Sequence, residues 1–345
     1  MILKPDFKFI TFEKDGTIFK FLETGDIFEI LSNEIMINMF NGTEKEGSLN
    51  NIYLRLYKKD LVKAIPLLGV KSNSKIFYDE NSILFEGVEE DLNYKIRFTL
   101  LNKNIWFYEI DVYGNDYEFD ILYCQDISIA NKKACITNEL YTSQYIDHKI
   151  LESENGYVVC SRQNQDQNGK FPYVEHGCLN SKIISYSTDQ MQFFSQEYKL
   201  TDVPFLLDKN LSKENYQFEL SYVAMQTEKM KLNKHKNVVF YGLFKENYDT
   251  LIKNLKYFHE IRNYFEELRN VKNNFKELNR VKIKNEFGTS LSSEKFSKSE
   301  IDEIYKLKKF EEYKEGELLS FFTENHSHVV LQERSFYVKD LMGIL

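Results

Sequence analysis

Proline and glycine are scarce in this chain, with only 4 prolines and 14 glycines among 345 residues. Aromatic residues make up 15% of it, including 28 phenylalanines and 23 tyrosines. Side chains of this size fill the space between two stacked sheets. The composition therefore favours β structure, and the length allows one large β domain with a smaller partner, or two ordinary domains.

A surplus of positive charge is also missing. The chain has 45 Lys and Arg against 53 Asp and Glu, a net charge of -8, so we expect no nucleic-acid partner. It contains no apolar run of about 18 residues, the length of a membrane span. Its N-terminal sequence, MILKPDFKFITFEKDG, is charged from the start and lacks an apolar signal core. We therefore expect no membrane partner and a cytoplasmic location.

Cysteine is rare, and its four positions are far apart. Cys124, Cys135, Cys160 and Cys178 show no CxxC spacing, whereas structural zinc sites use close ligand pairs. We expect reduced, largely buried thiols rather than disulfides. The GxSxG, HExxH and glycine-rich phosphate-loop motifs are also missing. We predict no metal site and no cofactor.

The pattern from residue 1 to about 245 is one of short alternating strands. Asp15-Gly16 separates FKFITFEK from TIFKFLE, which is a strong hairpin signal. Many further strands follow, divided by short polar turns. More than ten consecutive strands predict a large antiparallel β-sandwich over residues 1–245.

The hydrophobic period changes near residue 246. Apolar residues then recur mostly at three- and four-residue steps, and neither proline nor glycine occurs between Gly242 and Gly288. This pattern predicts one long amphipathic helix or a pair of helices. A second helix is expected to begin after Ser299, which suits an N-cap. The fold class is thus mainly β with a helical tail, residues 246–345 being a helical linker.

Neutral amides and aromatic residues are concentrated between Tyr141 and Gly177. Such side chains suit a neutral, polyhydroxylated ligand such as a sugar, with Tyr157 and Tyr173 stacking on its ring. The alternative is a structured loop whose amides bond to its own backbone, and the sequence leaves both open. The candidate carbohydrate-binding residues are Gln144, Tyr145, His148, Arg162, Gln163, Asn164 and Gln165.

Catalytic residues are not evident. Asp147 precedes His148, but neighbouring strand residues point to opposite faces, so we do not expect a dyad. Asp126, Asp147 and Asp189 each stand alone, whereas glycoside hydrolysis uses two carboxylates about 5–10 Å apart. We interpret these aspartates as turn or edge residues.

Six segments together resemble the N-terminal region of glycoside hydrolase family 94 enzymes, in the branch of cellobiose-phosphorylase-like and 1,2-β-oligoglucan phosphorylases. The resemblance covers most of residues 30–245, in the family's order. The segments are SNEIMINMF, QDISIA, YTSQYIDHK, YVVCSRQNQ, KFPYVEHG and STDQMQFF.

The resemblance implies a galactose-mutarotase-like supersandwich followed by linker helices and then an (α/α)6 barrel. It also implies reversible, inverting phosphorolysis of a β-glucoside to glucose 1-phosphate, with inorganic phosphate as co-substrate and an Asp of the barrel as general acid. The barrel is absent here, so no catalytic residue is carried over.

Two hypotheses follow. The chain is either the non-catalytic N-terminal portion of such a phosphorylase, or a stand-alone carbohydrate-binding or scaffold module. The expected partners are a β-glucan or β-glucoside oligosaccharide and either a separate barrel-containing chain or a second copy. An exposed apolar face is expected where the barrel is missing.

Overall fold

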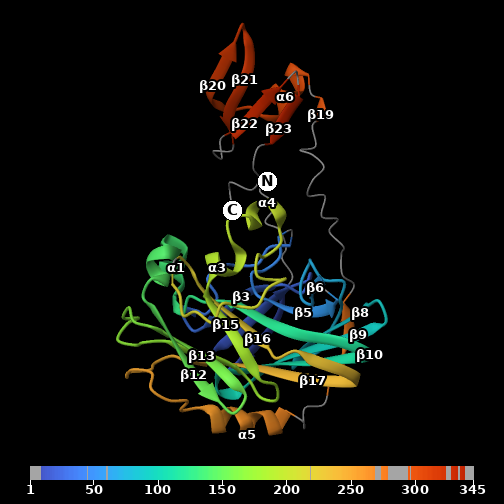
Figure 1. The fold of residues 1–345 in the computed structure, drawn as a ribbon. Coiled ribbons are helices and arrows are strands. Elements are labelled where there is room, and N and C mark those ends of the chain that lie inside the picture. The colour runs from blue at the N-terminus through green and yellow to red at the C-terminus, as the bar shows by residue number, and fades with distance from the viewer. Residues whose placement is uncertain are drawn as a thin grey trace. The chain divides into compact units, whose positions relative to one another are not determined.

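The computed structural model describes residues 9–44, 46–59, 61–217, 219–268, 273–278, 294–295, 297–323, 328–332 and 335–338. The chain forms two compact units, residues 1–283 and 284–345 (Figure 1). Strands dominate both units, so the mainly β fold class is confirmed. No helix of the described residues is long and apolar enough to cross a membrane. The cytoplasmic location stays a prediction.

A five-stranded antiparallel sheet begins the first unit, in the order β1-β2-β3-β4-β11. Asp15 and Gly16 form the β1–β2 turn with φ of 47° and 80°, the conformation that the Asp-Gly pair predicts. The strands are β1 (Phe9–Lys14), β2 (Thr17–Leu22), β3 (Ile27–Ser32), β4 (Ile35–Met36) and β11 (Ala130–Asn131).

A second sheet, of 13 described strands, has the main order β16-β15-β13-β14-β17-β10-β9-β8-β7-β18, with β12 beside β13 and β5 between β10 and β6. Its pairs are antiparallel except for a short parallel contact of β13 with β15. The strands are β5 (Asn51–Lys58), β6 (Leu61–Pro66), β7 (Lys75–Tyr78), β8 (Ser82–Glu89), β9 (Leu92–Leu101), β10 (Ile105–Asp126), β12 (Ile146–Ser153), β13 (Gly156–Gln163), β14 (Tyr173–Cys178), β15 (Ile183–Asp189), β16 (Ser221–Thr227), β17 (Met230–Lys245) and β18 (Lys276–Leu278).

Short helices connect some of these strands. They are η1 (Asn102–Asn104), α1 (Lys132–Thr137), α2 (Glu139–Ser143), α3 (Gln190–Phe194) and α4 (Tyr198–Thr201).

The main hydrophobic core lies between the two sheets. Strand β10 sends Trp106 and Tyr108 into this core, whereas Ile105 and Phe107 point into a second cluster on the other side. Successive strand residues alternate in this way. The ring of Phe19, on β2, lies 5.2 Å from that of Trp106. The abundant aromatic residues therefore fill the space between the sheets, as the composition predicts.

Gly242 on β17 leaves room for the indole ring of Trp106. The strand register pairs Trp106 with Gly242, and a Cβ atom at position 242 would lie 2.0 Å from the indole ring. Only glycine lets the ring pack this closely against the neighbouring backbone.

Helix α5 (Phe258–Leu268) covers the opposite face of the large sheet, near β12, β13 and β17 (Figure 1). Ile261 and Leu268 are buried there, and the ring of Phe265 lies 5.4 Å from that of Phe107. The helix has 11 residues, with no helix over residues 246–257 before it and a strand over residues 276–278 after it, so the expected long helix is wrong at both ends.

Residues 276–278 instead pair as β18 with β7. The edge of a sheet offers unpaired backbone groups, and this pairing overrides the helical period of the sequence.

The second unit contains helix α6 (Lys298–Ile304) and a sheet in the order β19-β23-β22-β21-β20. Ser297, rather than Ser299, caps α6 and forms a capping box with Glu300. The strands are β19 (Glu294–Lys295), β20 (Lys308–Lys314), β21 (Glu317–Thr323), β22 (His328–Gln332) and β23 (Ser335–Val338).

The helical linker expected over residues 246–345 is therefore wrong for residues 246–257 and 276–278 and for the described part of residues 308–338. Glu315 and Gly316, with φ of 53° and 83°, reverse the chain between β20 and β21, and the strands pair as a hairpin. The parts of the linker prediction that fall on residues 279–293 and 339–345 lie outside the described residues.

A buried ion pair joins the large sheet to the loop that precedes β16. Arg55 on β5 and Asp120 on β10 are each 1% exposed. Arg55 Nε donates to Asp120 Oδ1 at 2.7 Å, and Arg55 Nη1 donates to the carbonyl oxygen of Lys209. The Tyr57 hydroxyl and the Gln226 amide also donate to Asp120 Oδ2, at 2.7 and 3.0 Å. The carboxylate is thus surrounded by donors.

Replacing Asp120 by alanine is expected to destabilise the protein by about 3–5 kcal/mol, because it leaves the buried guanidinium without its counter-ion. Urea unfolding measures the change. Lys58→Ala is the control, since it breaks an exposed ion pair with Glu90, 2.5 Å long, and should change stability little. Equal effects of the two substitutions would contradict the assigned role of the Arg55–Asp120 pair.

Candidate functional site

His148, on β12, occupies a buried structural position. It is 3% exposed, and its Nδ1 and Nε2 lie 2.8 and 2.6 Å from the hydroxyls of Ser161 and Ser221. Burial lowers the pKa of His148 to about 4, so the ring is neutral at pH 7. Asp147 is exposed and faces away from the ring's environment, as expected for strand neighbours. Both ring nitrogens thus already have partners within the fold, and direct sugar contact by His148 stays a prediction.

Gln163, at the end of β13, stabilises the loop that follows this strand through hydrogen bonds of its buried side chain. It is fully buried. Its amide nitrogen donates to the carbonyl oxygens of Thr142 and Ser128 at 3.2 and 3.4 Å, and its oxygen accepts from the Gln165 backbone at 3.0 Å. The Gln163 amide therefore bonds to the backbone of its own segment, as the structural alternative predicts, and its contact with a ligand stays a prediction.

Arg162 is half-buried on β13 and fixes the chain that follows β17. Its Nε donates to the carbonyl oxygen of Tyr248 at 2.7 Å, and its guanidinium carbon lies 4.4 Å from the centre of the Phe171 ring. Its Nη1 donates to the side chain of Asn164, which is exposed. Sugar contact by Arg162 and Asn164 stays a prediction.

Gln144 and Tyr145 follow helix α2. Gln144 is exposed, and Tyr145 is half-buried with its ring 5.2 Å from that of Tyr141. Their role in binding also stays a prediction.

Tyr173 is not available as a stacking surface. It is 1% exposed, its ring lies 4.6 Å from that of Tyr248, and its hydroxyl donates to Glu175 Oε2 at 2.7 Å. Burial raises the pKa of the Glu175 carboxyl. Tyr157 is half-buried against Tyr186. The expected stacking on Tyr173 is therefore wrong.

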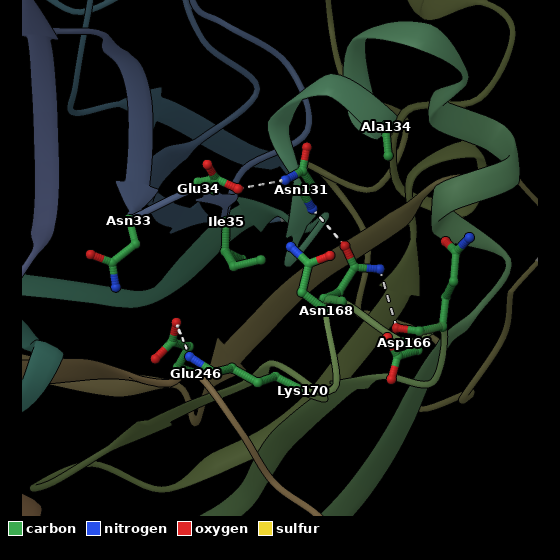
Figure 2. A pocket seen from close by; sticks show the side chains of 11 residues that line it. Asn33, Glu34, Ile35, Asn131, Ala134, Asp166, Asn168, Lys170 and Glu246 are labelled. Atoms are coloured by element: carbon green, nitrogen blue, oxygen red, sulfur yellow. Dashed lines mark hydrogen bonds and ion pairs between the residues drawn. The ribbon is translucent and has the colours of Figure 1, made fainter.

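A pocket of about 490 Å3 lies between the β3–β4 turn, the start of α1 and the loop from β13 to β14 (Figure 2). Of the seven predicted binding residues, Gln165 lines it. The lining consists of Asn33, Glu34, Ile35, Asn131, Ala134, Gln165, Asp166, Gln167, Asn168, Lys170 and Glu246.

Hydrogen bonds between the three segments frame this pocket. The Asn131 backbone donates to the Gln167 side-chain oxygen at 2.8 Å, and Asn131 Nδ2 donates to Glu34 Oε2 at 3.3 Å. Lys170 and Glu246 form an ion pair of 2.7 Å beside it (Figure 2). Residues that are distant in sequence therefore form one surface.

The loop over the pocket is shaped by a tight turn at Asn168-Gly169. These residues have φ of 58° and 80°, and the Gln167 backbone donates to the carbonyl oxygen of Lys170 at 2.9 Å. An Asn-Gly pair between extended segments is a strong hairpin signal, and it marks this loop in the sequence. Asn33, Asn131 and Glu246 carry no comparable signal, because only the fold brings them to the pocket.

All four cysteines are buried, and none forms a disulfide, as expected. Burial raises the pKa of the Cys124 and Cys160 thiols, which keeps them protonated. The described residues hold no cluster of three or more metal-ligating side chains.

Two family models match this chain. Residues 20–242 match the SOGP N-terminal domain, and residues 305–344 match the glycoside phosphorylase supersandwich domain. The second match falls on strands of the second unit. The predicted resemblance to the N-terminal region of such phosphorylases is confirmed.

A 1,2-β-oligoglucan phosphorylase from Listeria innocua serovar 6a is 33% identical over 320 residues, which is 91% of this chain and 28% of that protein. This chain therefore spans less than a third of the relative's length. Among solved structures, a polysaccharide lyase has a TM-score of 0.43 at 12% identity, over 74% of this chain and 34% of its own. A GalM/aldose epimerase homologue from C. elegans has a TM-score of 0.40 at 10% identity, over 70% of this chain and 100% of its own. Scores this low carry no functional inference.

Acid is expected to destabilise the protein through His148. The pKa of this residue is about 6.5 in the unfolded chain and about 4 in the folded one, so the unfolded state takes up the proton first. The stability that the neutral ring contributes is complete above pH 6.5 and is lost as the pH falls toward 4.

Urea unfolding at pH 7 and pH 4.5 measures this loss. His148→Gln should reduce the difference between the two pH values, whereas His259→Gln, at an exposed position on α5, should not. An unchanged pH dependence in His148→Gln would contradict the assignment.

Proposed function

The chain belongs to the family defined by the SOGP N-terminal domain, and from this we propose that it is the N-terminal, non-catalytic portion of a β-glucoside phosphorylase. The intact enzyme would cleave cellobiose or a 1,2-β-oligoglucan to glucose 1-phosphate with inversion, using inorganic phosphate as nucleophile. We propose no further cofactor.

The observation that carries this proposal is the match to the Listeria protein, which is named for its phosphorylase activity. The match includes 91% of this chain but only 28% of that protein. Most of the relative's length therefore lies outside the match, and we propose that the catalytic domain lies there.

Two aspartates of the first unit, Asp126 and Asp189, support a non-catalytic role, because their carboxylates serve the fold. Asp126 is buried with its pKa raised to about 6, and its Oδ2 accepts from the backbones of Met39 and Phe40 at 2.7 and 2.8 Å. Asp189 caps α3 by accepting from the Gln192 backbone at 2.9 Å. Both residues end a strand, as expected, but they are buried inside the large sheet rather than in exposed turns or at its edge.

The second unit exposes large apolar side chains. Phe310 is 79% exposed, Leu307 58%, Tyr313 57% and Ile304 52%. Because residues 305–344 match a supersandwich domain model, we propose that this surface packs against the remainder of such a domain, in the same or a separate chain. A second copy of this chain is the alternative partner.

A chimera tests the proposed function. Residues of this chain replace the matching 320 residues of the Listeria phosphorylase. We expect the chimera to release glucose 1-phosphate from 1,2-β-glucotriose and phosphate, and this chain alone to release none. Turnover by this chain alone would contradict the non-catalytic role. A folded chimera without activity would contradict the assignment to a phosphorylase.

A further inference from the structure

The amides of the pocket fall into two groups with different tasks. Asn131 and Gln167 are committed to the frame: the Asn131 side chain caps α1 and bonds to Glu34, and Gln167 bonds to Asn131 and to the carbonyl oxygen of Gln165. Asn33, Gln165 and Asn168 also line the pocket, but their side-chain amides make no hydrogen bond to another described residue. These three side-chain amides line the pocket without forming part of its frame, Asn33 and Asn168 at exposed turn positions and Gln165 half-buried.

The side-chain oxygen of Gln165 differs from the other amide atoms of the pocket because it is buried without a partner. Gln165 Oε1 is buried, yet it has no hydrogen-bond partner among the described residues. A buried acceptor without a donor lowers the stability of the fold. Rotation of the Gln165 side chain would bring this oxygen to the pocket, where a ligand hydroxyl would donate to it and remove this loss of stability.

The charges of the pocket select the kind of ligand. Glu34, Asp166 and Glu246 are acidic, and the single cation among the lining residues, Lys170, is paired with Glu246. The negative balance disfavours an anion such as phosphate or a sugar phosphate. Free amides both donate and accept, as hydroxyl groups do, which favours a neutral polyhydroxylated molecule.

The volume of the pocket and its apolar lining residues also fit a sugar. Volumes of about 300–1,000 Å3 are usual for small-molecule pockets, and this one measures about 490 Å3. Ile35, which is 7% exposed, and Ala134 give it an apolar part for the C–H face of a sugar ring. Aromatic side chains are not among the lining residues, so recognition would rest on hydrogen bonds rather than stacking.

We propose that Asn33, Gln165 and Asn168 form a binding site for a neutral gluco-oligosaccharide on the first unit. The choice of a glucan rests on the proposed function, while the preference for a neutral polyol rests on the pocket itself. The site lies in a domain to which we assign no catalysis, so it would hold the oligosaccharide without cleaving it.

Calorimetric titration of the full chain with 1,2-β-glucotriose tests the site. Gln165→Met keeps the side-chain length but removes the amide, and one neutral hydrogen bond corresponds to about a three- to tenfold loss in affinity. Asn168→Asp keeps a residue that tolerates the positive φ and removes the amide donor, so it should also weaken binding. Gln196→Met, an exposed position outside the pocket, is the matched control and should bind as the original chain does.

Two results with glucotriose would overturn the proposal: no binding at all, or equal binding by the original chain and both pocket variants. Two results with other ligands would also overturn it: tighter binding of glucose 1-phosphate than of glucotriose, or calcium binding that Asp166→Asn abolishes. Thermal unfolding of each variant shows whether it is folded, and Asn168→Asp serves as the second test if Gln165→Met is not.

The experiments can reject the proposed binding site and the proposed function independently of each other. An active chimera with no glucotriose binding by this chain would reject the pocket alone. Specific binding that Gln165→Met weakens, together with a folded but inactive chimera, would reject the phosphorylase assignment alone.

Discussion

Burial of strand β10 on both faces is the constraint on which the rest of the first unit depends. Trp106 and its alternate neighbours pack against the small sheet, while Phe107 packs against α5. A polar side chain placed in such a sheet must find partners inside the protein. Asp120 meets Arg55, and His148 stays neutral between two serine hydroxyls. The polar residues of the interior are thus part of the framework.

This constraint explains why the polar segment from residue 141 to 177 is divided. Where it forms β12 and β13, its inward side chains, such as His148 and Gln163, serve the fold. Where the chain leaves β13, it turns at Asn168-Gly169, and the side-chain amides of Gln165 and Asn168 make no hydrogen bond to another described residue. Recognition is assigned to the loop, and stability to the strands that hold it.

The strands of residues 1–245, the Asp15-Gly16 turn, the buried thiols and the family were predictable, because alternation, turn residues and characteristic segments are local signals. The strands of residues 308–338 were not, since their pairing depends on partners along the sheet. Of the pocket, sequence reasoning found Gln165 only. Asn33, Asn131 and Glu246 are distant in sequence, and nothing local shows that β4, β11 and β17 bring them together.

The central claim is that the loop between β13 and β14 binds the ligand, while β12 and β13 only support that loop. Hydrogen–deuterium exchange of the full chain, with and without 1,2-β-glucotriose, tests this claim most directly. The account predicts slower exchange of backbone amides at residues 33–35 and 165–170, and unchanged exchange along β12 and β13. Protection confined to residues 144–163 would contradict it, because it would place the ligand on the segment that the structure assigns to the framework.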